Sequence, residues 1–181
     1  IKSFLKVVKS LILIGYMGCG KTVLGKCLAK RKSLDFIDLD EFIETEENTS
    51  ISKIFERVGE LGFRKKERFY LEKLLSQNLR AIISLGGGTP CYFDNINYVI
   101  KKDRFQSVYL KTSPKILASR LFEERNHRPI ITHLDTPEDL EEFISKHLFE
   151  RVPFYTMAEY HISTNDRSIE YLVDQLEKLL T

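Results

Sequence analysis

Residues 15–22 read Gly-Tyr-Met-Gly-Cys-Gly-Lys-Thr and match the pattern G-x-x-x-x-G-K-[ST]. Glycines at three of these positions let the backbone fold closely around a phosphate, so that several N–H groups converge on its oxygens. A short apolar run precedes the pattern and a helical pattern follows it, so the N-terminus of that helix would also face the negative charge. The stretch therefore predicts a phosphate-binding loop between a strand and a helix.

The loop chemistry predicts binding of a nucleoside triphosphate. Lys21 would reach the β- and γ-phosphates, and the Thr22 hydroxyl would ligate Mg²⁺. A glycine-rich turn with an incidental lysine is the alternative, but the strand before it and the helix after it favour a nucleotide site. The residues expected to contact ATP here are Gly18, Cys19, Gly20, Lys21, Thr22 and Val23.

Short strand-like runs alternate with helical patterns along the chain, which predicts an α/β fold. The expected strands are residues 10–15, 35–39, 81–85, 105–110 and 160–163. The expected helices are residues 21–31, 51–57, 60–77, 114–122 and 169–180. Apolar sides are expected at Val23, Leu24, Cys27 and Leu28 of the first helix, and at Phe63, Phe69, Leu71, Leu74 and Leu75 of the third. This order predicts three α/β/α layers around a mostly parallel five-stranded sheet, a P-loop NTPase fold, with ligands at the carboxyl ends of the strands.

Length and charge narrow the class of protein. The chain has 181 residues, which favours a single domain over residues 1–181, and 28 basic against 26 acidic residues give a net charge of +2. So small a charge argues against a main role on nucleic acid or an anionic membrane. The longest early apolar run, Leu11–Ile14, is far too short to span a bilayer, and three scattered cysteines form no disulfide or zinc pattern. We expect a monomer in the cytoplasm.

Two segments stand out beyond the phosphate loop. Residues 123–137 are charged, contain two prolines and are long for a connection, which predicts a mobile lid. Asp38-Leu39-Asp40 ends the second predicted strand, and residues i and i+2 of a strand point to the same side. One aspartate could then hold Mg²⁺ through water while the other orients an acceptor hydroxyl; the alternative is that Asp38 caps a helix with Glu41 in its first turn.

Motifs outside the phosphate loop distinguish the classes of enzyme that bind nucleoside triphosphates. The base-reading NKxD motif of GTPases is missing, and the strand at 81–85 runs into Gly86-Gly87-Gly88 instead of the acidic pair of motor ATPases. Five matches in order make the chain resemble the shikimate kinases over residues 10–180. They are Gly15–Thr22, Asp38-x-Asp40, Gly59-Glu60-x-x-Phe63-Arg64-x-x-Glu67, Ser84–Gly88, and Arg128-Pro129 followed by Arg151-x-Pro153-x-Tyr155.

The resemblance implies ATP-dependent phosphorylation of the 3-hydroxyl of shikimate, on the route to chorismate. It implies that Asp40, Arg64, Gly87 and Arg151 bind shikimate, with a binding region over residues 40–67. Asp38 and Thr22 would serve Mg²⁺, and Arg128 would be a lid arginine that closes on the ATP phosphates, with Arg120 as a further phosphate contact. The implied catalytic residues are Lys21, Asp40 and Arg128. Residues 165–168 fall where the family covers adenine.

The substrate chemistry agrees, because arginines bind a carboxylate through two parallel hydrogen bonds and glycines allow close backbone approach. Alternatives remain for each residue: Arg64 on a solvated helix face, Arg151 capping a helix, and 86–88 as a plain turn. For the whole chain, the alternatives are another small-molecule kinase, such as one for gluconate or a nucleotide, and a binding protein with a degenerate site. The four histidines receive no role, and the Cys19 backbone, not its thiol, is expected to face phosphate.

Overall fold

The computed structural model describes residues 10–125 and 130–180 and contains one parallel sheet of five strands. The strands are β1 (Ser10–Ile14), β2 (Asp35–Asp38), β3 (Ala81–Ser84), β4 (Phe105–Lys111) and β5 (Tyr160–Ser163). Their order across the sheet is β2-β3-β1-β4-β5. The predicted fold class is confirmed, and every predicted strand lies within one residue of an observed one.

The central strands form because their residues suit a sheet that is covered on both faces. All five residues of β1 and all four of β3 are buried, and these strands consist mostly of leucine and isoleucine. In register, Leu11 of β1 lies beside Ile82 of β3 and Gln106 of β4. A strand buried on both faces reads as a continuous apolar run, and this signal made β1 and β3 predictable.

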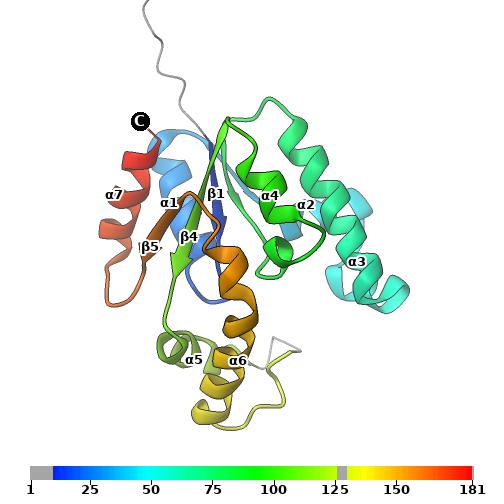
Figure 1. Ribbon diagram of the computed structural model, residues 1–181, viewed down its shortest axis with the longest axis vertical. Coiled ribbons are helices and arrows are strands. Elements are labelled where there is room, and N and C mark those ends of the chain that lie inside the picture. The colour runs from blue at the N-terminus through cyan, green and yellow to red at the C-terminus, as the bar shows by residue number, and fades with distance from the viewer. Residues whose placement is uncertain (1–9, 126–129, 181) are drawn as a thin grey trace, which may run out of the picture.

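The helices cover the sheet in layers (Figure 1). They are α1 (Lys21–Lys32), α2 (Leu39–Glu47), α3 (Ile51–Ser76), α4 (Asn95–Ile100), α5 (Pro114–Phe122), α6 (Pro137–Tyr155) and α7 (Ile169–Leu179), with a short 3₁₀ turn at Thr89–Cys91. The connection from β1 to β2 crosses the sheet in one direction and that from β3 to β4 in the other. Right-handed crossovers therefore place α1 and α4 on opposite faces, as Figure 1 shows.

Several local expectations need correction. Val23 is 51% exposed and Cys27 is exposed, so neither lies on the buried side of α1. Phe69 is also 60% exposed. The buried side of α3 is narrower than the set of apolar residues along the helix suggests. By contrast, the two helices predicted at 51–57 and 60–77 are confirmed within α3, because its backbone is not helical at Gly59, where φ is +69°. Helix α4 was not predicted, and α2 was expected only in the alternative in which Asp38 caps a helix.

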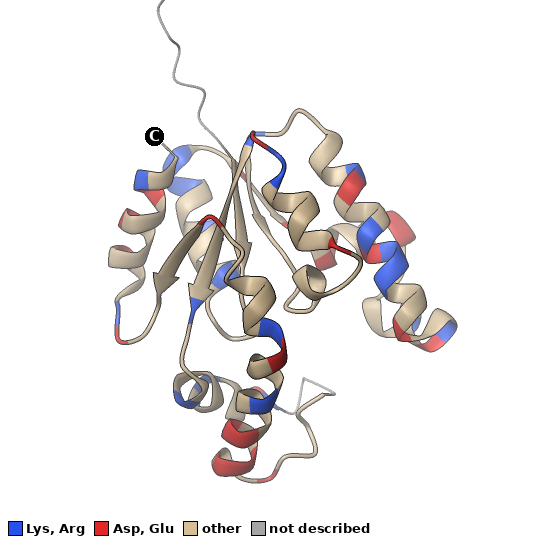
Figure 2. Cartoon of the chain, in the orientation of Figure 1, with Lys and Arg blue, Asp and Glu red and all other residues tan. Residues whose placement is uncertain are grey.

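The functional end of the molecule lies where the strands end. In Figure 1, α5 and α6 lie beyond the lower, carboxyl ends of the strands, and these two helices pack against each other. Basic and acidic residues are interspersed along the helices, whereas the strands carry little charge (Figure 2). In the described part of the chain, every helix is too short or too polar to cross a lipid bilayer.

Candidate active site

The predicted phosphate loop connects β1 to α1. Gly18 has φ +78°, and an added Cβ there would lie 3.0 Å from the Leu121 side chain. Gly20 has φ +102° and immediately precedes the first turn of α1. A side chain would strain the backbone at both positions, so these glycines allow the loop to turn tightly before the helix N-terminus. The loop predicted from the sequence thus has the backbone shape of an anion-binding site.

Charged side chains meet this loop from two helices. Lys21, the first residue of α1, places its Nζ 2.7 Å from the carbonyl oxygen of Gly15 and 3.0 Å from that of Tyr16, and donates to both. Arg120 of α5 donates from Nη1 to the carbonyl oxygen of Gly18 at 3.1 Å. Both predicted cations therefore reach the loop. Cys19 is 1% exposed, so its thiol lies beneath the loop.

A cavity of about 620 Å³ opens at the carboxyl ends of β1, β2 and β3. Its walls contain the predicted ATP-binding residues of the loop, together with Asp38, Asp40, Gly87 and Arg120. On the side of α5 and α7 the walls are completed by Leu121, Glu124, Thr164, Arg167, Ile169 and Leu172. One cavity thus joins the phosphate loop to the predicted acceptor side.

The two aspartates reach the cavity by a different route from the one predicted. Asp38 is the last residue of β2 and the N-cap of α2, and its Oδ1 accepts a hydrogen bond of 3.0 Å from the Asp40 backbone N–H. Asp40 lies in the first turn of α2, so the two are not strand residues i and i+2. The alternative, an N-cap followed by an acidic first turn, describes the local structure. Both carboxylates nevertheless line the cavity.

Among the acidic side chains that line this cavity, Asp40 has the most strongly shifted pKa. Burial, with the neighbouring carboxylates of Asp38 and Glu67, raises its pKa from 3.8 to about 6, against the opposing effect of Lys21 and Arg64. Near neutral pH the carboxylate is ionised but binds a proton more readily than an exposed aspartate does. Such a group is suited to accepting a hydrogen bond, or a proton, from a hydroxyl.

The run Gly86–Gly88 brings the remaining predicted residues together. A Cβ added at Gly86 would lie 3.1 Å from Asp40 Oδ1, and one at Gly87 would lie 3.6 Å from Arg151 Nη1. At Gly88 it would lie 2.6 Å from Arg64 Nη2. Each glycine thus faces one of the three charged side chains that sequence analysis assigned to the substrate. The run is a turn, but its lack of side chains is what admits these groups.

Arg64 is held in a buried network and does not lie on a solvated helix face. Only 11% of its side chain is exposed, and its Nη1 donates to Glu67 Oε2 at 3.0 Å. Glu67 is 1% exposed and accepts a second hydrogen bond of 2.6 Å from the Thr89 hydroxyl. The Tyr92 ring stacks 4.3 Å from the guanidinium. Within the described residues, Arg64 Nε is buried without a hydrogen-bond partner, which leaves a donor for a ligand.

Comparison with known proteins identifies the family. A family model described as "Shikimate kinase" matches residues 17–181. A shikimate kinase of Flavobacterium johnsoniae is 41% identical over 172 residues, which covers 95% of this chain and 99% of the relative. The chain belongs to the shikimate kinase family. Its activity is that of a shikimate kinase, an ATP-dependent phosphotransferase, so the gluconate and nucleotide alternatives are set aside.

Solved structures of shikimate kinases have the same architecture. The enzyme from Bacteroides thetaiotaomicron is 37% identical with a TM-score of 0.85, and the match covers 95% of this chain and 98% of that one. The enzyme from Acinetobacter baumannii, solved in complex with shikimate, is 31% identical with a TM-score of 0.82, covering 97% and 94%. The order β2-β3-β1-β4-β5 found here matches this family of structures.

Two expectations of the shikimate kinase resemblance fall wholly or partly outside the described residues. Arg128 lies there, and so does part of the expected lid at 123–137, which connects α5 to α6. Of the adenine-covering stretch, Asn165 accepts a hydrogen bond of 2.9 Å from the Ser113 backbone N–H, and Ser168 caps α7. Arg167, between them, lines the cavity.

Sequence analysis missed several residues that hold this shikimate kinase site in place. Glu67 and Tyr155 were part of quoted motifs but were given no role, and the Tyr155 hydroxyl donates to the Gly87 carbonyl oxygen at 2.6 Å. His147 was left without a role, yet it lies between Tyr16 and Arg151. No motif marks a contact between residues 131 positions apart, so only the folded chain shows it. Arg151 itself lies inside α6, and its guanidinium contacts His147.

Proposed function

We propose that this chain transfers the γ-phosphoryl group of ATP to the 3-hydroxyl of shikimate, with ATP over the phosphate loop and shikimate at Gly86–Gly88. The observation that carries the proposal is the convergence of Asp40, Arg64 and Arg151 on these three glycines, beside the cavity that contains Lys21. This arrangement supports a site in which Arg64 and Arg151 bind an anion and Asp40 accepts from a hydroxyl, next to the phosphate loop.

The carboxylate of shikimate would bind between Arg64 and Arg151. Each guanidinium can present parallel N–H donors to a carboxylate, which a lysine cannot do. Arg64 has a buried Nε without a hydrogen-bond partner, and Gly87 and Gly88, which lie beside Arg151 and Arg64, leave room for a ligand. With the carboxylate held there, a hydroxyl on the other side of the small ring would face Asp40. This geometry selects an anionic polyol of limited size.

Mg²⁺ fits the residues between the loop and β2. Thr22 supplies a hydroxyl and Asp38 a carboxylate, both on the wall of the cavity. Mg²⁺ in kinases keeps several waters and binds substrate phosphates through few protein oxygens, so a dense ligand cluster is unnecessary. The described residues indeed contain no group of three or more His, Cys, Asp or Glu side chains that could enclose a metal. When bound, the ion would neutralise phosphate charge.

In the reaction, the chain would position the groups and balance the charge. Asp40 would orient the 3-hydroxyl in line with the γ-phosphate and accept its proton as the new O–P bond forms and the bond from the γ-phosphorus to the bridging oxygen breaks, which releases ADP. Because transition states for phosphoryl transfer are loose, most of the acceleration would come from the charges of Lys21, Arg120 and the lid residue Arg128.

We further propose that residues 1–181 form one domain that acts as a cytoplasmic monomer.

The proposal is tested by coupled ADP release with Mg-ATP under three conditions, shikimate, gluconate and no acceptor, and with shikimate and ATP in the absence of Mg²⁺. Lys21→Ala is the blank, because it removes the phosphate-binding cation while leaving the acceptor residues in place. We expect ADP release that depends on shikimate and on Mg²⁺ and that is lost in the blank. Equal turnover with gluconate would contradict the roles of Arg64 and Arg151. ATP binding without turnover on any acceptor would contradict the activity itself.

A further inference from the structure

A chain of three polar side chains links the phosphate loop to the substrate arginine. The Tyr16 hydroxyl lies 2.9 Å from Nδ1 of His147, and Nε2 of the same ring lies 3.0 Å from Nη2 of Arg151. Tyr16 belongs to the loop and is 1% exposed, whereas His147 and Arg151 lie one turn apart on α6. The Phe143 ring packs edge-on against the imidazole, with centroids 5.1 Å apart. Both ring nitrogens of a half-buried histidine are thus occupied.

Hydrogen-bond chemistry determines the state of this histidine. A guanidinium is always protonated and can only donate, so Nε2 must accept from Arg151. The imidazole is therefore neutral with its proton on Nδ1, and that N–H donates to the Tyr16 hydroxyl oxygen. The tautomer follows from its partners, as it does for histidines that serve metals.

Arg151 differs from Arg64 in how its charge is balanced. Arg64 is ion-paired with Glu67 at 3.0 Å, whereas no acidic side chain in the described ranges lies within ion-pair distance of Arg151. A carboxylate partner would fix the guanidinium but neutralise the charge that a substrate anion needs. A neutral imidazole fixes the direction of the guanidinium and leaves its charge available. The same guanidinium stands 3.6 Å from a Cβ built at Gly87.

We propose that His147 is a positioning residue for the anionic substrate: neutral and held by Tyr16, it accepts from Arg151 and aims that guanidinium at the glycine run. The inference rests on the proposed function, because it assumes that the substrate carboxylate binds at Arg151. His147 touches no reacting atom, so its effect belongs to shikimate affinity and not to the chemical step. ATP affinity should be almost independent of it.

Protonation of His147 would break this arrangement, because an N–H would then face the guanidinium. The charged and titratable groups that face the ring are Arg151 and Glu150 on α6, Glu60 on α3 and Tyr16 on the loop. Burial, and then Arg151, lower the pKa of His147 below 6.5, while Glu150 and Glu60 oppose the shift. Shikimate affinity should therefore contain a component that is full at neutral pH and is lost on acidification.

Two amide substitutions separate the two contacts of the ring. His147→Gln places an amide oxygen near the position of Nε2, so it keeps an acceptor for Arg151 and cannot titrate. His147→Asn reaches only the position of Nδ1, so it keeps a partner for Tyr16 and loses Arg151. His161→Gln is the matched control, since His161 is exposed on β5, where its Nε2 lies 3.1 Å from the carbonyl oxygens of Thr156 and Ala158 and its ring packs edge-on against Tyr109, away from Arg151.

The measurement is shikimate Kd by calorimetry, with KM for both substrates, kcat and Tm for each variant. We expect His147→Asn to weaken shikimate binding about tenfold, the usual effect of losing a hydrogen bond to a charged group, with ATP KM and saturated kcat little changed. His147→Gln should bind shikimate more tightly than His147→Asn at neutral pH, with no larger loss than Tyr16→Phe shows, and should lack the acid-dependent component. Tyr16→Phe should change shikimate affinity in the same direction as His147→Asn, but less.

Equal shikimate affinity in His147→Asn and the wild type would overturn the inference. So would a parallel loss for both substrates, because that pattern would indicate a structural role in the phosphate loop. If His147→Asn does not fold, the comparison rests on His147→Gln and Tyr16→Phe: an unchanged acid component in the first, or unchanged affinity in the second, would overturn it. A wild type that does not bind shikimate at all would contradict the proposed function instead.

Discussion

Asp40 is a partly buried carboxyl group. Its raised pKa lowers the stability of the folded chain at neutral pH, but it suits the proposed role of accepting a proton from the substrate hydroxyl. Its pKa rises from 3.8 to about 6, so the folded chain holds the proton more tightly than the unfolded chain does. The cost of its ionisation is therefore absent below pH 3.8, grows as the pH rises towards 6, and is complete above that value.

Asp40→Asn should remove the free-energy cost of ionising this side chain in the folded state. It should also remove the carboxylate that would accept the proton of the substrate hydroxyl. At a pH above 6, the variant should be more stable by up to about 3 kcal/mol, because each pKa unit corresponds to about 1.4 kcal/mol. Near pH 4 the gain should vanish, and kcat should be greatly reduced at every pH. Urea unfolding at the two pH values measures the difference, with Asp35→Asn, at an exposed position of β2, as control. Equal gains at both pH values would contradict the account.

Gly88 tests the requirement for a missing side chain at the glycine run. A Cβ here would lie 2.6 Å from Nη2 and 2.9 Å from Cζ of Arg64, while φ is −87° and tolerates any residue. Gly88→Ala should therefore displace the guanidinium and raise the shikimate KM by about tenfold or more, as loss of a charge-assisted contact does. ATP KM should change little, whereas Tm should fall, because displacing the guanidinium also weakens its buried ion pair with Glu67. An unaltered shikimate KM would show that Arg64 does not bind substrate from this position.

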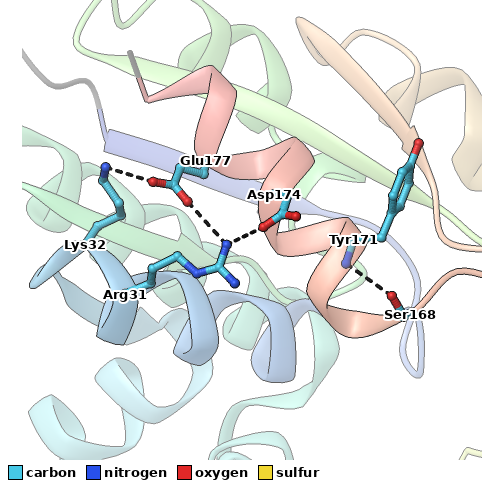
Figure 3. A network of polar contacts seen from close by, with 6 residues as sticks. All are labelled: Arg31, Lys32, Ser168, Tyr171, Asp174 and Glu177. Carbon is cyan, nitrogen blue, oxygen red and sulfur yellow. Dashed lines mark hydrogen bonds and ion pairs between the residues drawn. The ribbon is translucent and has the colours of Figure 1, made fainter.

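At the scale of elements, α7 is held against α1 by an exposed group of ion pairs (Figure 3). Arg31 contacts Asp174 at 2.5 Å and Glu177 at 3.2 Å, and Lys32 contacts Glu177 at 3.1 Å. These pairs lie on the outside of the helix whose Ile169 and Leu172 line the cavity. Buried Leu172, Val173 and Leu176 pack the other side of α7, so the ion pairs are not the main support.

Glu177→Gln removes two of these ion pairs and should have a small effect. Exposed pairs contribute little, and salt screens them further. Lys32 and Arg31 lower the pKa of Glu177, so its contribution is present at neutral pH and is lost as the solution becomes acidic. We expect a slightly lower Tm at low salt, no difference at high salt, and an unchanged ATP KM. A large rise in ATP KM would instead show that the ion pairs position the cavity wall.

Some helices and strands could be predicted from sequence patterns, and others could not. The strands β1 and β3 were predictable because continuous apolar runs follow directly from burial on both faces. Helix α2 was expected only as an alternative because it begins directly after β2, so the strand pattern at 35–39 extended into it. Phe69 was misplaced because helical periodicity indicates which residues share a side, not how wide the buried stripe is.

For the whole molecule, the motifs named the charged residues of the site but not how they are held. Gly15–Thr22, Asp40, Arg64, Gly87 and Arg151 were all predicted, and the fold brings them to one edge of the sheet. Two of the contacts that orient them, Glu67 with Arg64 and His147 with Arg151, lie one turn apart on a helix, where spacing permits a contact but does not show that it forms. The third, Tyr155 with Gly87, joins elements far apart in sequence, and pattern spacing carries no information on it.

The central claim is that Arg64 and Arg151, gathered at the glycine run, bind the carboxylate of the substrate. The most direct test compares the calorimetric Kd of shikimate with that of its methyl ester, for the wild type, Arg64→Met and Arg151→Met. The wild type should prefer the free acid at least about tenfold, because the ester loses charge-assisted hydrogen bonds, and either substitution should greatly reduce that preference. A wild type that binds both equally, or variants that keep the full preference, would contradict the account.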